Sequence, residues 1–102
     1  MIVVFTARAR NDLDRIGTYI HQDNPRRAIT FVREIVERSK KLADMPHRFS
    51  LVPGYEKAGI RRVPHGNYLI YYKVTDQRIE VLSVLHGAQD HDAILFPEDD
   101  EI

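Results

Sequence analysis

The chain has 102 residues, of which 43% are hydrophobic and 29% charged, and its 15 Lys and Arg residues balance its 15 Asp and Glu residues. This composition indicates one small globular domain, because a chain of this length has little material for a second core. Cysteine is absent, which excludes disulfides, thiolate catalysis, Cys-ligated zinc and iron–sulfur clusters.

A short apolar run is followed by an amphipathic segment. The residues from Ile2 to Thr6 are mostly β-branched or aromatic, which predicts a first strand. From about Ala7 the apolar residues recur at helical spacing, which predicts a helix that ends near Asp23. The apolar stripe of this helix consists of Leu13, Ile16, Gly17 and Ile20.

A second helix is expected directly after the first. Asn24 supplies an N-cap side chain, and Pro25 stands at the first helical position, where its missing N–H costs nothing. The helix should end at Met45-Pro46, because proline excludes the α region for the residue before it. Two helices joined by so short a segment form an antiparallel hairpin. The apolar positions of the second helix are Ala28, Ile29, Val32, Ile35, Val36 and Leu42.

Three strand-like runs follow residues 46–59, which we expect to form a loop or a short irregular strand. The runs extend from Ile60 to Val63, from Tyr68 to Val74 and from Arg78 to His86, so that neighbouring runs can pair as antiparallel hairpins. Strict alternation in the last run places Ile79, Val81, Ser83 and Leu85 on one face and Glu80, Leu82, Val84 and His86 on the other. Because both faces carry apolar residues, this run is expected to be a central strand.

The predicted order is β-α-α-β-β-β, an α+β fold in which a helical hairpin packs on one face of a small, mostly antiparallel sheet. We expect residues 1–96 to form a single domain and residues 97–102 to form an acidic, frayed tail. Residues 90–96 have room for one helical turn. Since only one helical layer is available, the other face of the sheet should be partly open, and a binding surface would be built there.

The charges are unevenly distributed along the chain. Residues 1–73 contain 14 basic and 7 acidic residues, and residues 74–102 contain 1 and 8. A basic body can attract an anionic partner, although a solvated basic surface with a solubilising acidic end explains the same pattern more simply. No apolar stretch approaches the ~20 residues that span a bilayer, and the N-terminal run is too short for a signal peptide. We therefore expect a cytoplasmic protein without membrane contact.

Five short motifs occur along the chain: Leu13-x-x-Ile16-x-x-Tyr19-Ile20, Asn24-Pro25-x-x-Ala28-x-x-Phe31, Gly59-Ile60-Arg61-Arg62, Tyr68-x-Ile70-x-Tyr72-x-Val74 and Val84-Leu85-His86-Gly87-Ala88-x-Asp90. In order and spacing they resemble the ParE branch of the RelE/ParE superfamily of type II toxin–antitoxin toxins. The resemblance implies the same β-α-α-β-β-β order and a small antitoxin whose C-terminal segment wraps around the toxin. It also implies an activity, which is inhibition of DNA gyrase in the ParE branch and cleavage of messenger RNA on the ribosome in the RelE branch. Because the branches share a scaffold, the fold does not choose between them.

A ribosome-dependent endoribonuclease would need a general base, a general acid and cations that neutralise charge on phosphate. The candidate catalytic residues for this alternative are Arg61, Arg62 and His86. Arg61 and Arg62 are neighbours in a strand, so their side chains point to opposite faces and only one can line a given site. His86 is better explained as a strand-end histidine that bonds to nearby backbone. The set is incomplete, and we favour a toxin that acts by binding rather than as an enzyme.

A gyrase inhibitor needs only a surface that holds its target, and arginine and aromatic side chains suit such a surface. We expect Arg61, Arg62, Tyr68, Tyr72 and His86 to bind the target. Tyr71 should point to the opposite face from Tyr68 and Tyr72, and one of these two faces must be core.

Antitoxin binding is predicted at Tyr19, Ile29 and Phe31, which lie near the margin of the apolar stripes. An exposed apolar groove on a basic body suits an acidic, apolar peptide that folds on binding, although the same side chains could complete the core. His86, Asp90, His91 and Asp92 carry ligating groups, but their spacing fits no metal geometry, and a solvated terminus explains them better. We expect no metal, no cofactor and no small-molecule substrate. A third alternative is a binding module that keeps its antitoxin complex without toxicity.

Overall fold

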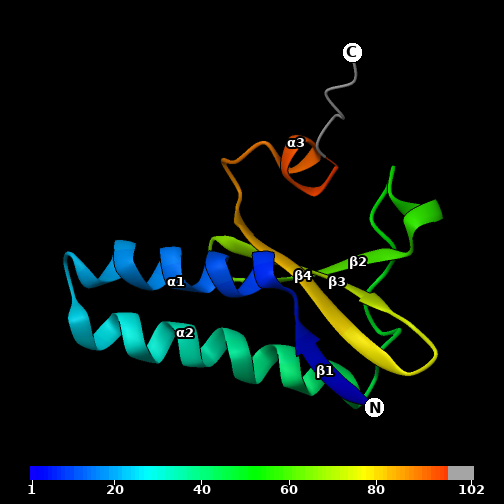
Figure 1. Ribbon diagram of the computed structural model, residues 1–102, viewed down its shortest axis with the longest axis horizontal. Coiled ribbons are helices and arrows are strands. Elements are labelled where there is room, and N and C mark those ends of the chain that lie inside the picture. Colours follow the sequence, from blue (N-terminus) through cyan, green and yellow to red (C-terminus); the bar gives the residue numbers. More distant parts are fainter. Residues whose placement is uncertain (97–102) are drawn as a thin grey trace.

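The computed structural model describes residues 1–96 and has the predicted order of one strand, two helices and three strands (Figure 1). The elements are β1 (Ile2–Phe5), α1 (Ala7–His21), α2 (Pro25–Lys40), β2 (Ile60–His65), β3 (Tyr68–Val74), β4 (Arg78–His86) and α3 (His91–Leu95), with short 3₁₀ turns η1 (Lys41–Ala43) and η2 (Glu56–Ala58). The predicted acidic tail, residues 97–102, lies outside the described residues. No helix in residues 1–96 is both long enough and apolar enough to cross a membrane.

Side-chain caps define where both long helices begin. The Thr6 hydroxyl accepts from the backbone N–H of Ala9 at 3.1 Å, and the Asn24 side chain accepts from that of Arg27 at 3.1 Å. Pro25 is the first residue of α2, as predicted. The Thr6 hydroxyl also donates to the Leu82 carbonyl at 2.9 Å, so the cap of α1 is bonded to β4 as well. The helical hairpin is therefore attached to the sheet at the point where the chain leaves β1.

The sheet has the strand order β1-β4-β3-β2, with β1 parallel to β4 and the other pairs antiparallel. The prediction that the last strand is central is confirmed. β2 is longer than predicted, because Pro64 and His65 continue the strand and the turn consists only of Gly66 and Asn67. Proline is accepted at this position because β2 is an edge strand, where a missing N–H need not cost a ladder bond. Gly66 has a φ of 60°, which suits a tight two-residue hairpin turn.

A β-bulge changes which residues of β4 face the helices. The register with β3 shifts between Tyr71, opposite Ser83, and Tyr72, opposite Val81. Val84 therefore joins Val81 in the helix-side core, and Leu85 belongs to the cluster on the other face. The prediction that Leu85 shares a face with Val81 was wrong, since strict alternation does not survive the extra residue of a bulge. The Ser83 hydroxyl still donates to a side chain of α1, Asp12.

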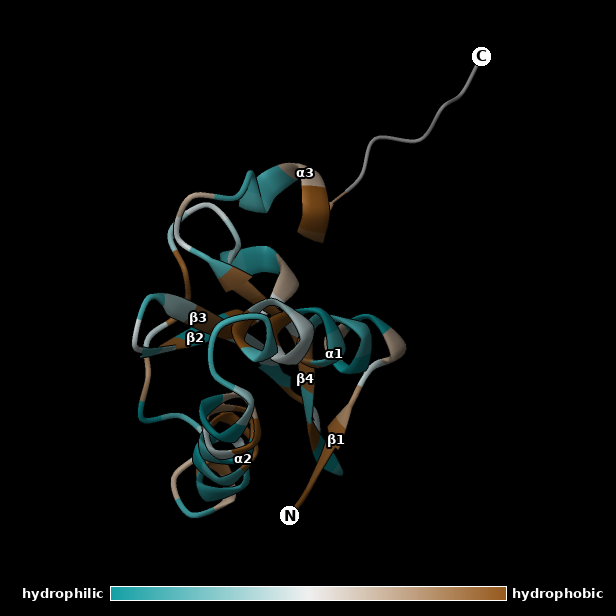
Figure 2. Cartoon of the chain, turned by 90° about the vertical axis from the view of Figure 1, so that its left-hand side faces the viewer, coloured by the Kyte–Doolittle hydropathy of each residue, from teal (hydrophilic) through white to brown (hydrophobic). Residues whose placement is uncertain are grey.

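The two faces of the sheet are both covered by the chain itself. The helix-side core contains, among others, Ile16, Phe31, Ile35, Ile70 and Tyr72. On the second face, a smaller cluster of Val52, Ile60, Tyr71 and Leu85 is buried under side chains that include Tyr55, Ala58, Ile94 and Leu95. In Figure 2, α3 lies at the top and α2 at the bottom, with β2 and β3 between them. The second face, which was expected to be partly open, is therefore covered in part, because η2, the segment before it and α3 fold back over the sheet.

Candidate partner-binding surfaces

The predicted target-binding residue Tyr72 is not on a surface. Its side chain is 0% exposed in the helix-side core, and its hydroxyl donates to the Pro46 carbonyl at 3.1 Å. Burial raises the pKa of Tyr72, and the nearby Arg61 opposes this effect. The assignment of Tyr72 to a target-binding surface is corrected accordingly, because the side of β3 that it shares with Tyr68 is largely covered by the helices.

The two predicted arginines lie on different faces of the sheet. Arg61 stands opposite Tyr72 in the sheet, and its Nη1 donates to the Phe49 carbonyl at 2.6 Å. Arg62 stands opposite Tyr71, and its Nη1 donates to the Tyr71 hydroxyl at 3.3 Å on the second face. The sequence prediction that only one of them can line a given site agrees with this arrangement.

Tyr68 and His86 lie in a groove at the end of the helical hairpin, which we call the hairpin groove. It has a volume of about 650 Å³. Its apolar and aromatic lining comes from Ile16, Tyr19, Ile20, Phe31 and Tyr68. Its polar lining comes from Arg15, Arg27, Asn67, His86 and Gln89. The groove thus joins α1 and α2 to the β2–β3 turn and to the end of β4.

The hairpin groove contains residues that the sequence assigned to two different partners. Tyr68 and His86 were predicted to bind the target, and Tyr19 and Phe31 to bind the antitoxin. Tyr19 is 67% exposed, whereas Phe31 is 9% exposed and mostly belongs to the core. The third predicted antitoxin residue, Ile29, is 61% exposed on the same hairpin but does not line the groove.

Ring contacts connect the aromatic residues of the groove. The ring centroids of Phe31 and Tyr68 are 5.6 Å apart, and those of Tyr68 and His86 are 5.2 Å apart in an edge-to-face arrangement. Burial raises the pKa of Tyr68, the Tyr19 hydroxyl adds to this effect and Arg15 opposes it. The half-buried Tyr68 ring therefore connects the nearly covered Phe31 ring to the exposed His86 ring.

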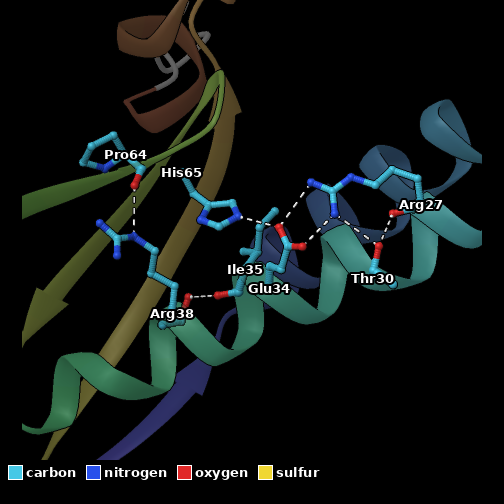
Figure 3. A network of polar contacts seen from close by, with 8 residues as sticks. Arg27, Thr30, Glu34, Ile35, Arg38, Pro64 and His65 are labelled. Atoms are coloured by element: carbon cyan, nitrogen blue, oxygen red, sulfur yellow. Dashed lines mark hydrogen bonds and ion pairs between the residues drawn. The ribbon is translucent and has the colours of Figure 1, made fainter.

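The charged residues at the rim are held by neighbouring carboxylates outside the groove. Arg15 pairs with the buried Asp12, with 2.6 Å between Nη2 and Oδ1. Arg27 pairs with Glu34 at 2.6 Å, and its guanidinium carbon lies 5.0 Å from the centre of the Phe31 ring. Figure 3 shows Glu34 between Arg27 and His65, and these two residues, Arg27 foremost, lower the pKa of Glu34.

The groove itself is rich in hydrogen-bond donors. None of its lining residues within the described chain is Asp or Glu. The Nδ1 atom of His86 accepts from the backbone N–H of Ala88 at 3.2 Å, so the proton of the neutral ring is assigned to Nε2. The Gln89 side-chain oxygen accepts from the backbone N–H of His86 at 2.7 Å, which leaves its amide group to donate. The groove therefore favours a ligand that presents acceptors or negative charge.

A second concave surface, which we call the loop cleft, lies on the second face of the sheet. It has a volume of about 1140 Å³, and Tyr55, Arg62, Tyr71, His91 and Asp92 are among its lining residues. His91 Nε2 lies 2.7 Å from the His86 carbonyl, which can only accept, so Nδ1 accepts from the Tyr71 hydroxyl at 2.6 Å. Both ring nitrogens of His91 are thus used within the chain.

Sequence reasoning missed this arrangement around His91. His91 was assigned to a solvated terminus, but it is partly buried, and its ring packs edge-to-face on Tyr71 at 5.5 Å. The neighbouring Asp92 accepts a hydrogen bond from the Tyr55 hydroxyl. No periodicity could have joined these residues, because they come from three separated segments. In residues 1–96, no three His, Asp or Glu side chains gather closely enough to hold a metal ion.

Comparisons with known proteins relate the chain to bacterial toxins. A family described as the ParE toxin of the type II toxin–antitoxin system parDE matches residues 3–91. The putative toxin Y4kP of Sinorhizobium fredii is 30% identical over 93 residues, which are 89% of this chain and 93% of that protein. A chain of the chromosomal ParDE toxin–antitoxin system of P. aeruginosa has a TM-score of 0.73 and 25% identity, covering 84% of this chain and 95% of that one. A chain of the RelBE2 toxin–antitoxin complex of Mycobacterium tuberculosis has a TM-score of 0.62 and 26% identity, covering 86% and 92%.

Proposed function

The chain belongs to the ParE toxin family of type II toxin–antitoxin systems, and we propose that it is a toxin that inhibits DNA gyrase by binding to it. A cognate antitoxin neutralises it in the resting cell, and both partners are met in the cytoplasm. The observation that carries the proposal is the hairpin groove, an open surface of exposed Tyr19, the Tyr68 and His86 rings and two arginines. Such a surface suits a macromolecular partner, since aromatic and arginine side chains dominate the affinity of protein interfaces.

The geometry favours binding over catalysis by the candidate nuclease residues, Arg61, Arg62 and His86. Arg61 is four residues from His65, about 13 Å along β2, and His65 lies opposite Tyr68, which lies opposite His86. Arg62 is on the other face of the sheet from His86. Neither arginine is therefore placed to act on the same phosphate as His86.

One observation supports a second candidate, a ribosome-dependent endoribonuclease like the RelE branch. In the loop cleft, Arg62, Tyr71 and His91 form a hydrogen-bonded chain that pairs a cation with two groups able to move a proton. This candidate predicts cleaved messenger RNA in a translating extract, and loss of cleavage on His91→Ala but not on His86→Ala.

Supercoiling of relaxed plasmid by purified gyrase tests the main proposal. The toxin should inhibit supercoiling, its complex with antitoxin should not, and His86→Ala should weaken the inhibition. Tyr72→Phe is the matched control, because it changes a buried tyrosine that no partner reaches. Full supercoiling at saturating toxin would contradict gyrase as the target, and harmless induction of the chain alone in cells would indicate a binding module without toxicity.

A further inference from the structure

We infer that the toxin also contacts the DNA that gyrase holds, through a basic surface at the opposite end of α2 from the hairpin groove. This inference rests on the proposed function and adds a nucleic acid to its partners. The surface, which we call the basic shoulder, lies where α2 ends and where η1 and the following loop begin. Its members are Arg38, Lys40, Lys41 and Arg48, with Arg61 of β2 beside them.

The charge of the basic shoulder is concentrated in one short segment. Residues 38–48 contain four basic residues and one acidic residue, Asp44. All four basic residues are exposed, and none forms an ion pair with a carboxylate of residues 1–96. Arg15 and Arg27 at the hairpin groove do form such pairs. The shoulder therefore attracts an anionic partner, because the chain itself does not neutralise its positive charge.

Neighbouring backbone and ring atoms hold two arginines of the shoulder in place. Arg38, Lys41 and Arg48 line one depression of about 280 Å³. The Nε atom of Arg38 donates to the Pro64 carbonyl at 3.0 Å, as Figure 3 shows, and its Nη atoms form no hydrogen bond within residues 1–96. The guanidinium carbon of Arg48 lies 5.6 Å from the centre of the Phe49 ring. Both side chains are thus positioned without a carboxylate, and their remaining donors are available to a ligand.

The helix dipole explains only part of this charge. Basic residues in the last turn of a helix stabilise its C-terminal end, and Arg38 and Lys40 are in the last turn of α2. Arg48 and Arg61 lie outside the helix, and Arg38 bonds to a carbonyl of β2 instead of a carbonyl of the helix. Binding of an anionic partner accounts for these residues, which stabilisation of the helix does not.

The basic shoulder suits the phosphates of a DNA duplex better than a protein surface. Protein interfaces are dominated by aromatic and apolar anchors, and Met45 is the only large apolar side chain of residues 38–48 that is exposed. Phosphates, in contrast, accept half or more of the hydrogen bonds in protein–DNA complexes, many of them from arginine and lysine. A single strand would need an aromatic ring with an open face, but Phe49 is half-buried and Arg48 lies over its ring. The backbone of a duplex is therefore the expected ligand.

The hairpin groove and the basic shoulder can be occupied by one complex of gyrase and DNA. Phe31 lines the groove, and Lys41 of the shoulder follows ten residues later along α2 and η1. At a rise of 1.5 Å per residue, the two are separated by about 15 Å along the helix axis. Because gyrase acts on DNA, a gyrase surface that binds in the groove brings a duplex close to the toxin. The shoulder is the surface that can bind this duplex.

The salt dependence of duplex binding tests the basic shoulder directly. The probe is a labelled DNA duplex, titrated with wild-type toxin and with the double variant Lys41→Gln, Arg48→Gln. Each phosphate contact contributes about −0.9 to the slope of log K against log salt, so four cations predict a slope of about −3.6, and the double variant about −1.8. Between about 50 and 200 mM salt, the affinity should fall about 100-fold for the wild type and about tenfold for the double variant.

Two further double variants separate the shoulder from charge elsewhere and from folding. Arg10→Gln, Arg26→Gln removes the same charge from exposed positions outside the shoulder and should keep the wild-type slope. Lys41→Arg, Arg48→Lys keeps both charges of the shoulder and should also keep the slope. Melting curves check that every variant is folded. Equal slopes for the two variants that lose charge would overturn the inference.

Binding to gyrase with and without DNA tests which partner the shoulder contacts. Wild-type toxin should bind the gyrase–DNA complex more tightly than gyrase alone. The variant Lys41→Gln, Arg48→Gln should lose this gain and bind gyrase alone as the wild type does. Weaker binding of the variant to gyrase alone would overturn the inference, by identifying a protein surface as the occupant. Tighter binding of single-stranded RNA than of the duplex would overturn it as well.

Failure of the inference can be told apart from failure of the proposed function. A wild-type toxin whose binding to gyrase is unaffected by DNA would overturn the inference and leave the proposed function intact. A wild-type toxin that never binds gyrase, with or without DNA, would refute the proposed function and the inference with it.

Discussion

Replacing Asp12 by alanine is expected to loosen α1 from the sheet. Asp12 is 3% exposed, and its Oδ2 accepts from the Ser83 hydroxyl and from the Val84 N–H, the latter at 2.9 Å. Its Oδ1 pairs with Arg15 at 2.6 Å. One carboxylate of α1 thus satisfies two buried donors of β4 directly beside the bulge.

The size of the effect follows from what the substitution leaves unpaired. Each buried donor without a partner costs about 1–3 kcal/mol, so the Ser83 and Val84 donors together predict a loss of about 2–6 kcal/mol. The ion pair adds little, since the Arg15 side chain is 58% exposed and exposed pairs contribute about 0–1 kcal/mol. The lower bound corresponds to a fall in Tm of at least about 8 °C for a domain of this size.

Urea unfolding followed by circular dichroism measures this loss as a shift of the midpoint at unchanged slope. Asp12→Asn keeps an acceptor oxygen and should lose about 1 kcal/mol. The control is Asp14→Ala, which changes an exposed carboxylate two residues further along α1. Its free energy of unfolding should stay within about 0.5 kcal/mol of the wild-type value. The reasoning fails if Asp12→Ala loses less than about 1 kcal/mol, or no more than Asp12→Asn.

Three further outcomes are expected. Tyr72→Phe removes one buried hydroxyl bond and should lower the free energy of unfolding by about 0.5–1.5 kcal/mol without changing supercoiling inhibition. Gly66→Ala should lose about 1–2 kcal/mol in urea unfolding, because its φ of 60° penalises an L side chain, and Gly66→Asn should lose less. Arg27, and then His65, lower the pKa of Glu34 in the folded state, so the stabilisation is fully present above the unfolded pKa of about 4.3 and is lost as pH falls through the folded value. The difference in urea midpoint between wild type and Glu34→Gln should therefore shrink from pH 7 to pH 3, and a constant difference would contradict this cause.

Local sequence signals predicted the fold where they act over a few residues. Asn24-Pro25 begins α2 as expected, and the helical spacing of apolar residues locates both long helices. The buried face of α1 is nevertheless shifted, since Asp12 is buried and Leu13 is only half-buried. Periodicity counts apolar residues, and it does not recognise a polar residue that is buried because a distant strand supplies its hydrogen bonds.

Long-range contacts account for the errors about the candidate site. Alternation along β3 places Tyr68 and Tyr72 on one face. How far each side chain is buried depends on how far the helices extend over that face. The burial of Tyr71 depends on Tyr55 and Ile94, which fold over the sheet from segments far away in the chain. Tyr19 was assigned to a binding surface from its place at the margin of the stripe, and that assignment stays a prediction that the groove supports.

The chain covers the apolar cluster on the second face of the sheet, which favours the hairpin groove as the surface that binds a partner. A macromolecule could bind directly to the Val52, Ile60, Tyr71 and Leu85 cluster on that face only after the loop before β2 and α3 moved away, which would expose the cluster to water. The hairpin groove requires no such movement, because the two segments beside it are short. The α1–α2 connection ends at the Asn24 cap, and the β2–β3 turn contains only Gly66 and Asn67. Since neither segment is long enough to fold over Tyr19 and Tyr68, these two side chains stay accessible, and a partner can bury them without first disrupting the toxin.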